Sequence, residues 1–128
     1  MKNYFLIIGI VFISLGCDKI DEKCVEEKFA SAIVYEFPDS LYLSATHQLK
    51  IEYVIENSCG SFVEFEDTIV DNNTEVKIKT LYEGCNCTLE FLQEEKFYPL
   101  HQDSVGKYHY KFWMSETEFD EYTLTVFE

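Results

Sequence analysis

The 128-residue sequence contains no arginine, and all ten of its basic residues are lysines. Twenty-four aspartates and glutamates leave a formal net charge of −14. This charge repels phosphate backbones, so we expect no nucleic-acid binding. It also repels anionic lipid headgroups, so charge cannot hold the protein on a membrane. The simplest role of the acidity is solubility.

The signatures of common active sites are also missing. The sequence has no Gly-x-Ser-x-Gly, no His-Glu-x-x-His and no glycine-rich phosphate loop. Its three histidines, His47, His101 and His109, lack the spacing of zinc ligands. Glu64 and Glu66 lie two residues apart in a predicted strand, which indicates a solvated face rather than a glycosidase pair. We therefore expect no enzyme activity, with no catalytic residues, no metal and no cofactor.

An apolar stretch opens the chain. Lys2 is the only charge before Cys17, and about a dozen largely apolar residues follow from Tyr4. A basic start, a short apolar run and a small residue before the cut predict a secretory signal. A membrane-spanning helix needs roughly 20 apolar residues, so this run is too short to span comfortably.

The residues that end this stretch, Ser14-Leu15-Gly16-Cys17, resemble the lipobox of bacterial lipoproteins, with the family's commonest order of leucine and small residue swapped. The resemblance implies cleavage before Cys17, diacylglycerol on its sulfur and acylation of its new amino group. The alternative is an ordinary signal peptide with a cysteine nearby. Three acyl chains exceed what stable anchoring requires, so we expect the membrane to be one partner.

These features predict three segments: a signal peptide over residues 1–16, a lipidated cysteine and charged tether over 17–27, and one domain over 28–128. Because Lys2 is the only charge in the first segment, cleavage takes the net charge from −14 to −15. We expect the mature protein on the cell outer membrane, facing the periplasm or the surface.

Four cysteines remain after Cys17: Cys24, Cys59, Cys85 and Cys87. An even number in an exported chain indicates disulfides. A bridge between Cys85 and Cys87 would close a very tight ring, so we expect Cys59 to pair with one of them and Cys24 with the other. The rival interpretation is a thiol-redox or metal-binding protein that uses the Cys85-x-Cys87 pair.

The rest of the chain alternates apolar and polar residues in period two. The clearest strand runs over 47–56, where Leu49, Ile51, Tyr53 and Ile55 share one face. Other expected strands cover 29–35, 62–66, 76–80, 87–92, 97–100, 107–114 and 122–126. Seven or eight short strands with frequent turns predict an all-β, antiparallel sandwich. We expect Tyr53, Ile78, Phe112 and Leu124 in its core.

The stretch Asp103-Ser104-Val105-Gly106-Lys107-Tyr108 resembles the entry to the penultimate strand of immunoglobulin-like and fibronectin-like domains. The resemblance implies that Tyr108 is the tyrosine corner of such a sandwich. The segments 57–62 and 84–88 also resemble uncharacterised small lipoproteins of the Bacteroidetes, which imply no known activity.

Three triplets combine aspartate, a hydroxyl residue and an aliphatic residue: Asp39-Ser40-Leu41, Asp67-Thr68-Ile69 and Asp103-Ser104-Val105. They resemble the O-glycosylation sequon of exported Bacteroidetes proteins, which makes Ser40, Thr68 and Ser104 candidate sites. Chance predicts roughly 0.3 such matches, so three is an excess. The alternative is that these pairs are simply good turn formers.

Together these observations predict a lipid-anchored binding or assembly module with an unidentified protein or glycan partner. The alternative function is the periplasmic thiol or metal protein. Free-thiol titration distinguishes the two.

Overall fold

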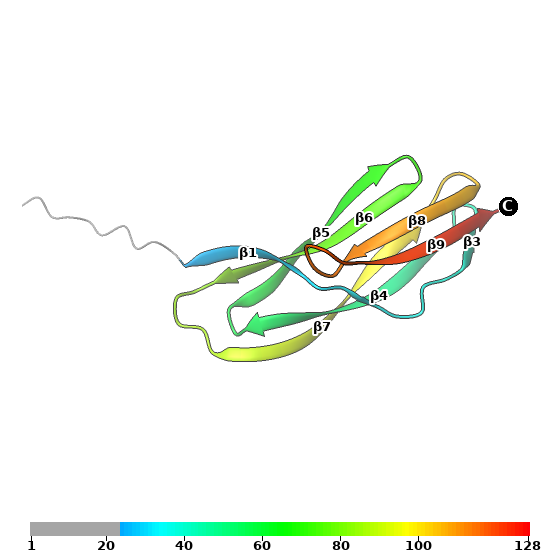
Figure 1. The fold of residues 1–128 in the computed structure, drawn as a ribbon. Coiled ribbons are helices and arrows are strands. Elements are labelled where there is room, and N and C mark those ends of the chain that lie inside the picture. Colours follow the sequence, from blue (N-terminus) through cyan, green and yellow to red (C-terminus); the bar gives the residue numbers. More distant parts are fainter. Residues whose placement is uncertain (1–23) are drawn as a thin grey trace, which may run out of the picture.

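The computed structural model describes residues 24–128, which form two stacked β-sheets (Figure 1). Nine strands make them up: β1 (Val25–Ala30), β2 (Ile33–Val34), β3 (Ser40–Tyr42), β4 (Thr46–Asn57), β5 (Gly60–Val70), β6 (Asn73–Glu83), β7 (Leu89–His101), β8 (Gly106–Trp113) and β9 (Phe119–Phe127). The predicted signal peptide and the lipidation site Cys17 lie outside the described residues. Between residues 24 and 128, no helix is long and apolar enough to cross a membrane.

The larger sheet follows the order β1-β6-β8-β9-β3, with β5 on the other edge of β6, and the smaller sheet is β2-β4-β7. The predicted all-β sandwich is therefore confirmed. The prediction that every pairing is antiparallel is wrong, because β6 pairs with β8 and β3 with β9 in parallel.

The strand boundaries differ from the predicted ones at two places. The segment 29–35 is divided into β1 and β2, which belong to different sheets, because the chain crosses between them at Ser31 and Ala32. The predicted strands 87–92 and 97–100 are one continuous strand, β7. The polar and charged residues Gln93–Lys96 do not interrupt it, because β7 is an edge strand that leaves polar side chains in water.

One edge of β6 is shared by two strands. β1 pairs with its second half, from Ala30 opposite Ile78 to Val25 opposite Glu83, and β8 pairs with its first half, at residues 73–76. The Ala32 N–H donates a 3.0 Å hydrogen bond to the Trp113 carbonyl where the two strands meet. β1 begins at Val25, so residues 25–27 of the predicted tether belong to the sheet.

The core lies between the sheets and follows the alternation in the sequence. Tyr53, Ile78, Phe112 and Leu124 are all 0% exposed, which confirms the four predicted core positions. Burial and a 2.6 Å hydrogen bond to Asp120 raise the pKa of Tyr122, at the margin of this core, to about 12.

Candidate binding surface and the disulfide-bridged end

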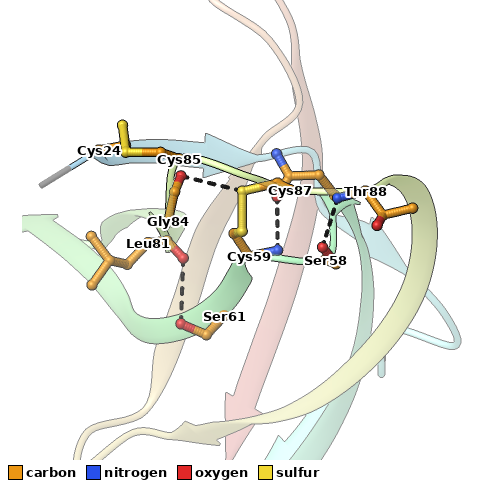
Figure 2. The surroundings of a disulfide bond; sticks show 10 residues. Cys24, Ser58, Cys59, Ser61, Leu81, Gly84, Cys85, Cys87 and Thr88 are labelled. Atoms are coloured by element: carbon orange, nitrogen blue, oxygen red, sulfur yellow. Dashed lines mark hydrogen bonds between the residues drawn. A yellow bond between two sulfur atoms is a disulfide. The ribbon is translucent and has the colours of Figure 1, made fainter.

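Two disulfides join the cysteines at one end of the sandwich (Figure 2). Cys24 is bonded to Cys85 and Cys59 to Cys87, so each member of the Cys-x-Cys pair joins a different segment. This confirms the predicted pattern and decides between its two versions. The first bridge fastens the start of β1 to the loop after β6, and the second fastens the β4–β5 turn to the same loop.

The local backbone explains why this loop brings four cysteines together. Gly84 has a φ of +134°, and a Cβ there would lie 2.9 Å from the Cys59 sulfur, so only glycine fits without strain. Its N–H donates to the Cys24 carbonyl at 2.8 Å, and the Glu83 N–H donates to the Cys59 carbonyl at 3.1 Å. Backbone hydrogen bonds thus position both bridges.

Ser58 and Thr88 close the loop from its other side. The Thr88 N–H donates to the Ser58 hydroxyl at 2.9 Å, and the Ser58 N–H donates to the Thr88 carbonyl at 3.0 Å (Figure 2). The Cys87 sulfur lies 3.3 Å from the Gly84 carbonyl oxygen, which is a contact rather than a hydrogen bond, because a bridged sulfur carries no proton. All four cysteines therefore act as covalent links in this structure.

The three glycosylation candidates lie away from the disulfide-bridged end. Ser40 begins β3, Thr68 lies in β5 near the β5–β6 turn, and Ser104 lies in the β7–β8 loop. All three residues are exposed. Ser104 differs from the other two because its hydroxyl oxygen lies 2.6 Å from the Tyr108 hydroxyl, whereas no hydrogen bond holds the hydroxyl of Ser40 or Thr68 within residues 24–128.

Two tyrosines in the interior of the sandwich donate hydrogen bonds to carboxylates of neighbouring strands. Tyr53 donates a 2.8 Å hydrogen bond to Glu94 of β7, and Tyr98 of β7 donates one of 2.8 Å to Asp67 of β5. Burial, with these hydrogen bonds, raises the pKa of both tyrosines well above its usual range. Burial also raises the pKa of Asp67, against the opposite effect of the Tyr98 hydrogen bond. These contacts fix β7 against the core.

An exposed apolar surface follows β7. This thirteen-residue strand pairs with β4 along one edge, and no described strand pairs with its other edge (Figure 1). Leu89, Phe91 and Phe97, which alternate with inward-facing residues, are 77%, 69% and 55% exposed. Val54 of β4, which lies opposite Gln93 on the same face, is also exposed, and so is Leu92 on the other face of β7. We call these five residues, with the free edge of β7, the β7 strip.

Charged side chains occupy the middle of the same sheet face. Lys50 of β4 forms ion pairs with Glu95 of β7 at 3.0 Å and with Glu52 at 3.4 Å. The Gln93 side chain donates a hydrogen bond to Glu52. This network separates the apolar residues at the two ends of the strip, and its groups are already paired with one another.

A second polar cluster joins β4 to the end of β7. The Thr46 hydroxyl lies 3.1 Å from Nδ1 of His101, and Nε2 of His101 lies 2.8 Å from the Asp103 carboxylate. The order of groups is that of a nucleophile, a base and an acid. The Asp103 side chain, however, is 87% exposed, whereas the acid of such a triad orients its histidine from a buried position. We assign the cluster a structural role in holding the two strand ends together.

A hollow of about 440 Å³ lies beside β2 and β4 and is lined by polar groups, among them Tyr35, Glu36, His47 and Lys50. Between residues 24 and 128 no three histidine, cysteine or acidic side chains converge as metal ligands do. The hollow is a wide depression open to solvent, and Tyr35 is the one phenylalanine, tyrosine or tryptophan that lines it.

The β7 strip was not predicted from the sequence. Its signal was present, because Phe91-Leu92 and Phe97-Tyr98 each place two apolar residues in succession on a strand that should alternate. Because the sequence predicts two short strands in this region, it does not reveal that both apolar pairs lie on one edge strand.

A family model described as the ORF11 beta-sandwich domain matches residues 49–126, which include most of β4, all of β5 to β8 and most of β9. No curated protein and no solved structure matches the chain.

Proposed function

The chain belongs to the ORF11 β-sandwich domain family, and we propose that it is a lipid-anchored, non-catalytic assembly module that binds its partner through the β7 strip. Cys17 carries the lipid in this proposal, and the protein resides on the cell outer membrane. The domain holds the strip rigidly on the surface and performs no chemistry.

The observation that carries the proposal is the combination of a free strand edge and exposed apolar side chains on the same strand. Unpaired backbone groups along an edge bind a further strand, and apolar residues beside them add area that leaves water on binding. Monomeric proteins usually protect long edges, whereas β7 exposes Leu89, Phe91 and Phe97. This combination favours assembly through β7.

The positions of the glycosylation candidates also support the β7 strip as the binding surface. Ser40 and Thr68 belong to the larger sheet, and Ser104 lies in a loop beyond the end of β7. Glycans on these residues would cover the other sheet and the end of the domain remote from the disulfides. They would leave the smaller sheet, and with it the β7 strip, accessible.

The disulfides support a binding role over thiol or metal chemistry. Cys85 and Cys87 are bonded to Cys24 and Cys59 rather than to each other. A thiolate is the reactive and ligating form of cysteine, so neither residue is available for either chemistry while its bridge is intact.

Site-specific photo-crosslinking in intact cells tests the proposal. A benzophenone amino acid replaces Phe91 or Phe97 in two variants of the full chain and Tyr42 in a control. Tyr42 is 65% exposed and lies on β3, an edge strand of the larger sheet, whereas β7 belongs to the smaller one. We expect a discrete adduct from positions 91 and 97 and none from position 42. Equal labelling at all three positions, or an adduct only at 42, would contradict the proposal.

A further inference from the structure

The geometry of β7 leads us to propose its partner: a second copy of this chain, joined edge to edge through antiparallel pairing of the two β7 strands about Gln93. This inference rests on the proposed function, because it names what the β7 strip binds. The two three-stranded sheets then form one continuous sheet in the order β2-β4-β7-β7-β4-β2.

Pro99 shows which backbone groups of β7 face the free edge. It lies opposite Gln48 in the β4–β7 ladder and has no N–H to donate. Proline is accepted in an edge strand where its nitrogen faces away from the neighbouring strand. The β4–β7 register is regular from His101 to Leu92, so alternate residues share this direction. The N–H and C=O groups of residues 97, 95 and 93 therefore point to the free edge, and a β-bulge follows between Leu92 and Leu89.

A symmetric pair centred on Gln93 uses those groups. Gln93 lies opposite its own copy, Phe91 opposite Glu95, and Leu89 opposite Phe97. Gln93, Glu95 and Phe97 present backbone groups to the free edge, so the central pair can exchange two hydrogen bonds, as a narrow antiparallel pair does. Pro99, which has no donor, falls outside the paired segment. The Leu89–Phe97 pair occurs twice and covers the two most separated apolar side chains of the strip.

Charge complementarity selects this register. Lys96 is the only lysine in β7, and in this alignment it lies opposite Glu90 of the other copy. Both residues are exposed. The twofold symmetry repeats the Glu90–Lys96 pair, because in an isologous interface every contact occurs twice. A pairing centred on Glu95 would instead place that carboxylate opposite itself, which is unfavourable.

Anchoring makes such a contact effective. A single-edge interface is small, and each copy carries a large negative charge that opposes association in solution. Two chains held on one membrane by Cys17 have a much higher effective concentration, so a weak interface suffices.

Charge reversal in co-expressed, differently tagged full-length copies tests the inference. Membranes are solubilised in mild detergent, and recovery of one tag with the other is measured. Wild-type copies should co-purify. Glu90→Lys alone and Lys96→Glu alone each produce two repulsive pairs, so recovery should fall about tenfold. Glu116→Lys and Lys107→Glu, which make the same charge changes away from β7, should leave recovery unchanged.

The decisive sample mixes the two defective variants. A copy with Glu90→Lys beside a copy with Lys96→Glu has two attractive pairs, so recovery should return to the wild-type level. This result also shows that both variants fold, which matters because Lys96 lies 5.0 Å from the Phe62 ring centre. No recovery in the mixed sample, no loss in the single variants, or no co-purification of wild-type copies would each overturn the inference. In that event, a photo-adduct at positions 91 and 97 with the mass of another protein would leave the proposed function standing.

Discussion

The Tyr108 hydroxyl donates a 2.7 Å hydrogen bond to the backbone carbonyl of Ser104, four residues earlier in the chain. This is the tyrosine-corner contact that the sequence predicts for Tyr108. The tyrosine proton is used in this bond, so the Ser104 hydroxyl must donate its own proton to the Tyr108 oxygen, 2.6 Å away. The two residues thus fix the β7–β8 loop.

Removing this hydroxyl should weaken the domain. We expect Tyr108→Phe to lower the free energy of unfolding by about 1 kcal/mol, because the Ser104 carbonyl loses its donor. Chemical denaturation measures the change. Tyr42→Phe, whose side chain is exposed, is the control and should change stability by less than about 0.5 kcal/mol. Equal effects of the two variants would show that the corner contributes nothing.

The same pair of residues distinguishes the glycosylation candidates. A glycan on Ser104 would remove the proton that its hydroxyl donates to Tyr108, whereas Ser40 and Thr68 make no comparable bond within the described residues. If the triplets are used, we expect glycan mass on Ser40 and Thr68 and little on Ser104. Mass spectrometry of the protein from its native host, with Ser40→Ala and Thr68→Ala as controls, measures the occupancy. Full occupancy of Ser104 would contradict this order.

The disulfides should contribute separately to stability. The bridged cysteines are separated by 61 residues in one case and 28 in the other, which corresponds to about 4 and about 3.5 kcal/mol of unfolded-state entropy. Replacing Cys24 and Cys85 together by serine, or Cys59 and Cys87 together, should lower the melting temperature in each case. Thiol titration of the unreduced wild-type protein should find no free thiol among these four. Two free thiols at Cys85 and Cys87 would instead favour the redox or metal alternative.

The burial of Asp67 predicts a dependence of stability on pH. Burial raises the pKa of Asp67 in the folded protein, so the folded state binds this proton more tightly than the unfolded chain. Stability from this group therefore falls as the pH rises through the window between the usual and the raised pKa. Asp67→Asn keeps an acceptor for Tyr98 but removes the charge.

We expect Asp67→Asn to melt at the same or a higher temperature than the wild type at pH 7. Any difference in melting temperature between the two proteins should disappear below about pH 3, where the wild-type carboxyl is also neutral. Thr68→Ala controls for loss of the glycosylation triplet. A large loss of stability in Asp67→Asn at pH 7 would show that the ionised carboxylate stabilises the fold.

The anchor is tested by Cys17→Ser. The thiol is the lipid acceptor in our proposal, so this variant should remain uncleaved or leave the membrane fraction. Fractionation followed by detection of the mature N-terminus measures both outcomes. Cys24→Ser, paired with Cys85→Ser to avoid a free thiol, is the matched control and should stay membrane-bound. Release of the wild-type protein without detergent would contradict the proposal.

The sequence determined which side chains face inward. In β4 and β8 the alternation is a local property of the chain, and a strand puts successive side chains on opposite faces wherever it is placed. This is why Tyr53 and Phe112 were identified as core residues. The prediction that each of Cys85 and Cys87 bonds a distant cysteine also rests on local geometry alone, because a bridge between these two residues would close a strained ring.

Only the tertiary structure decided which strands are neighbours. The same period-two pattern suits either sheet and either direction, so it could not reveal that β8 lies parallel to β6 or that Cys24 bonds to Cys85 rather than Cys87. For the same reason the free edge of β7 was not visible. A strand has a free edge only where no other strand pairs with it, and this depends on where every other strand of the fold lies. The free edge of β7 gives the exposed Phe91 and Phe97 their proposed role in binding.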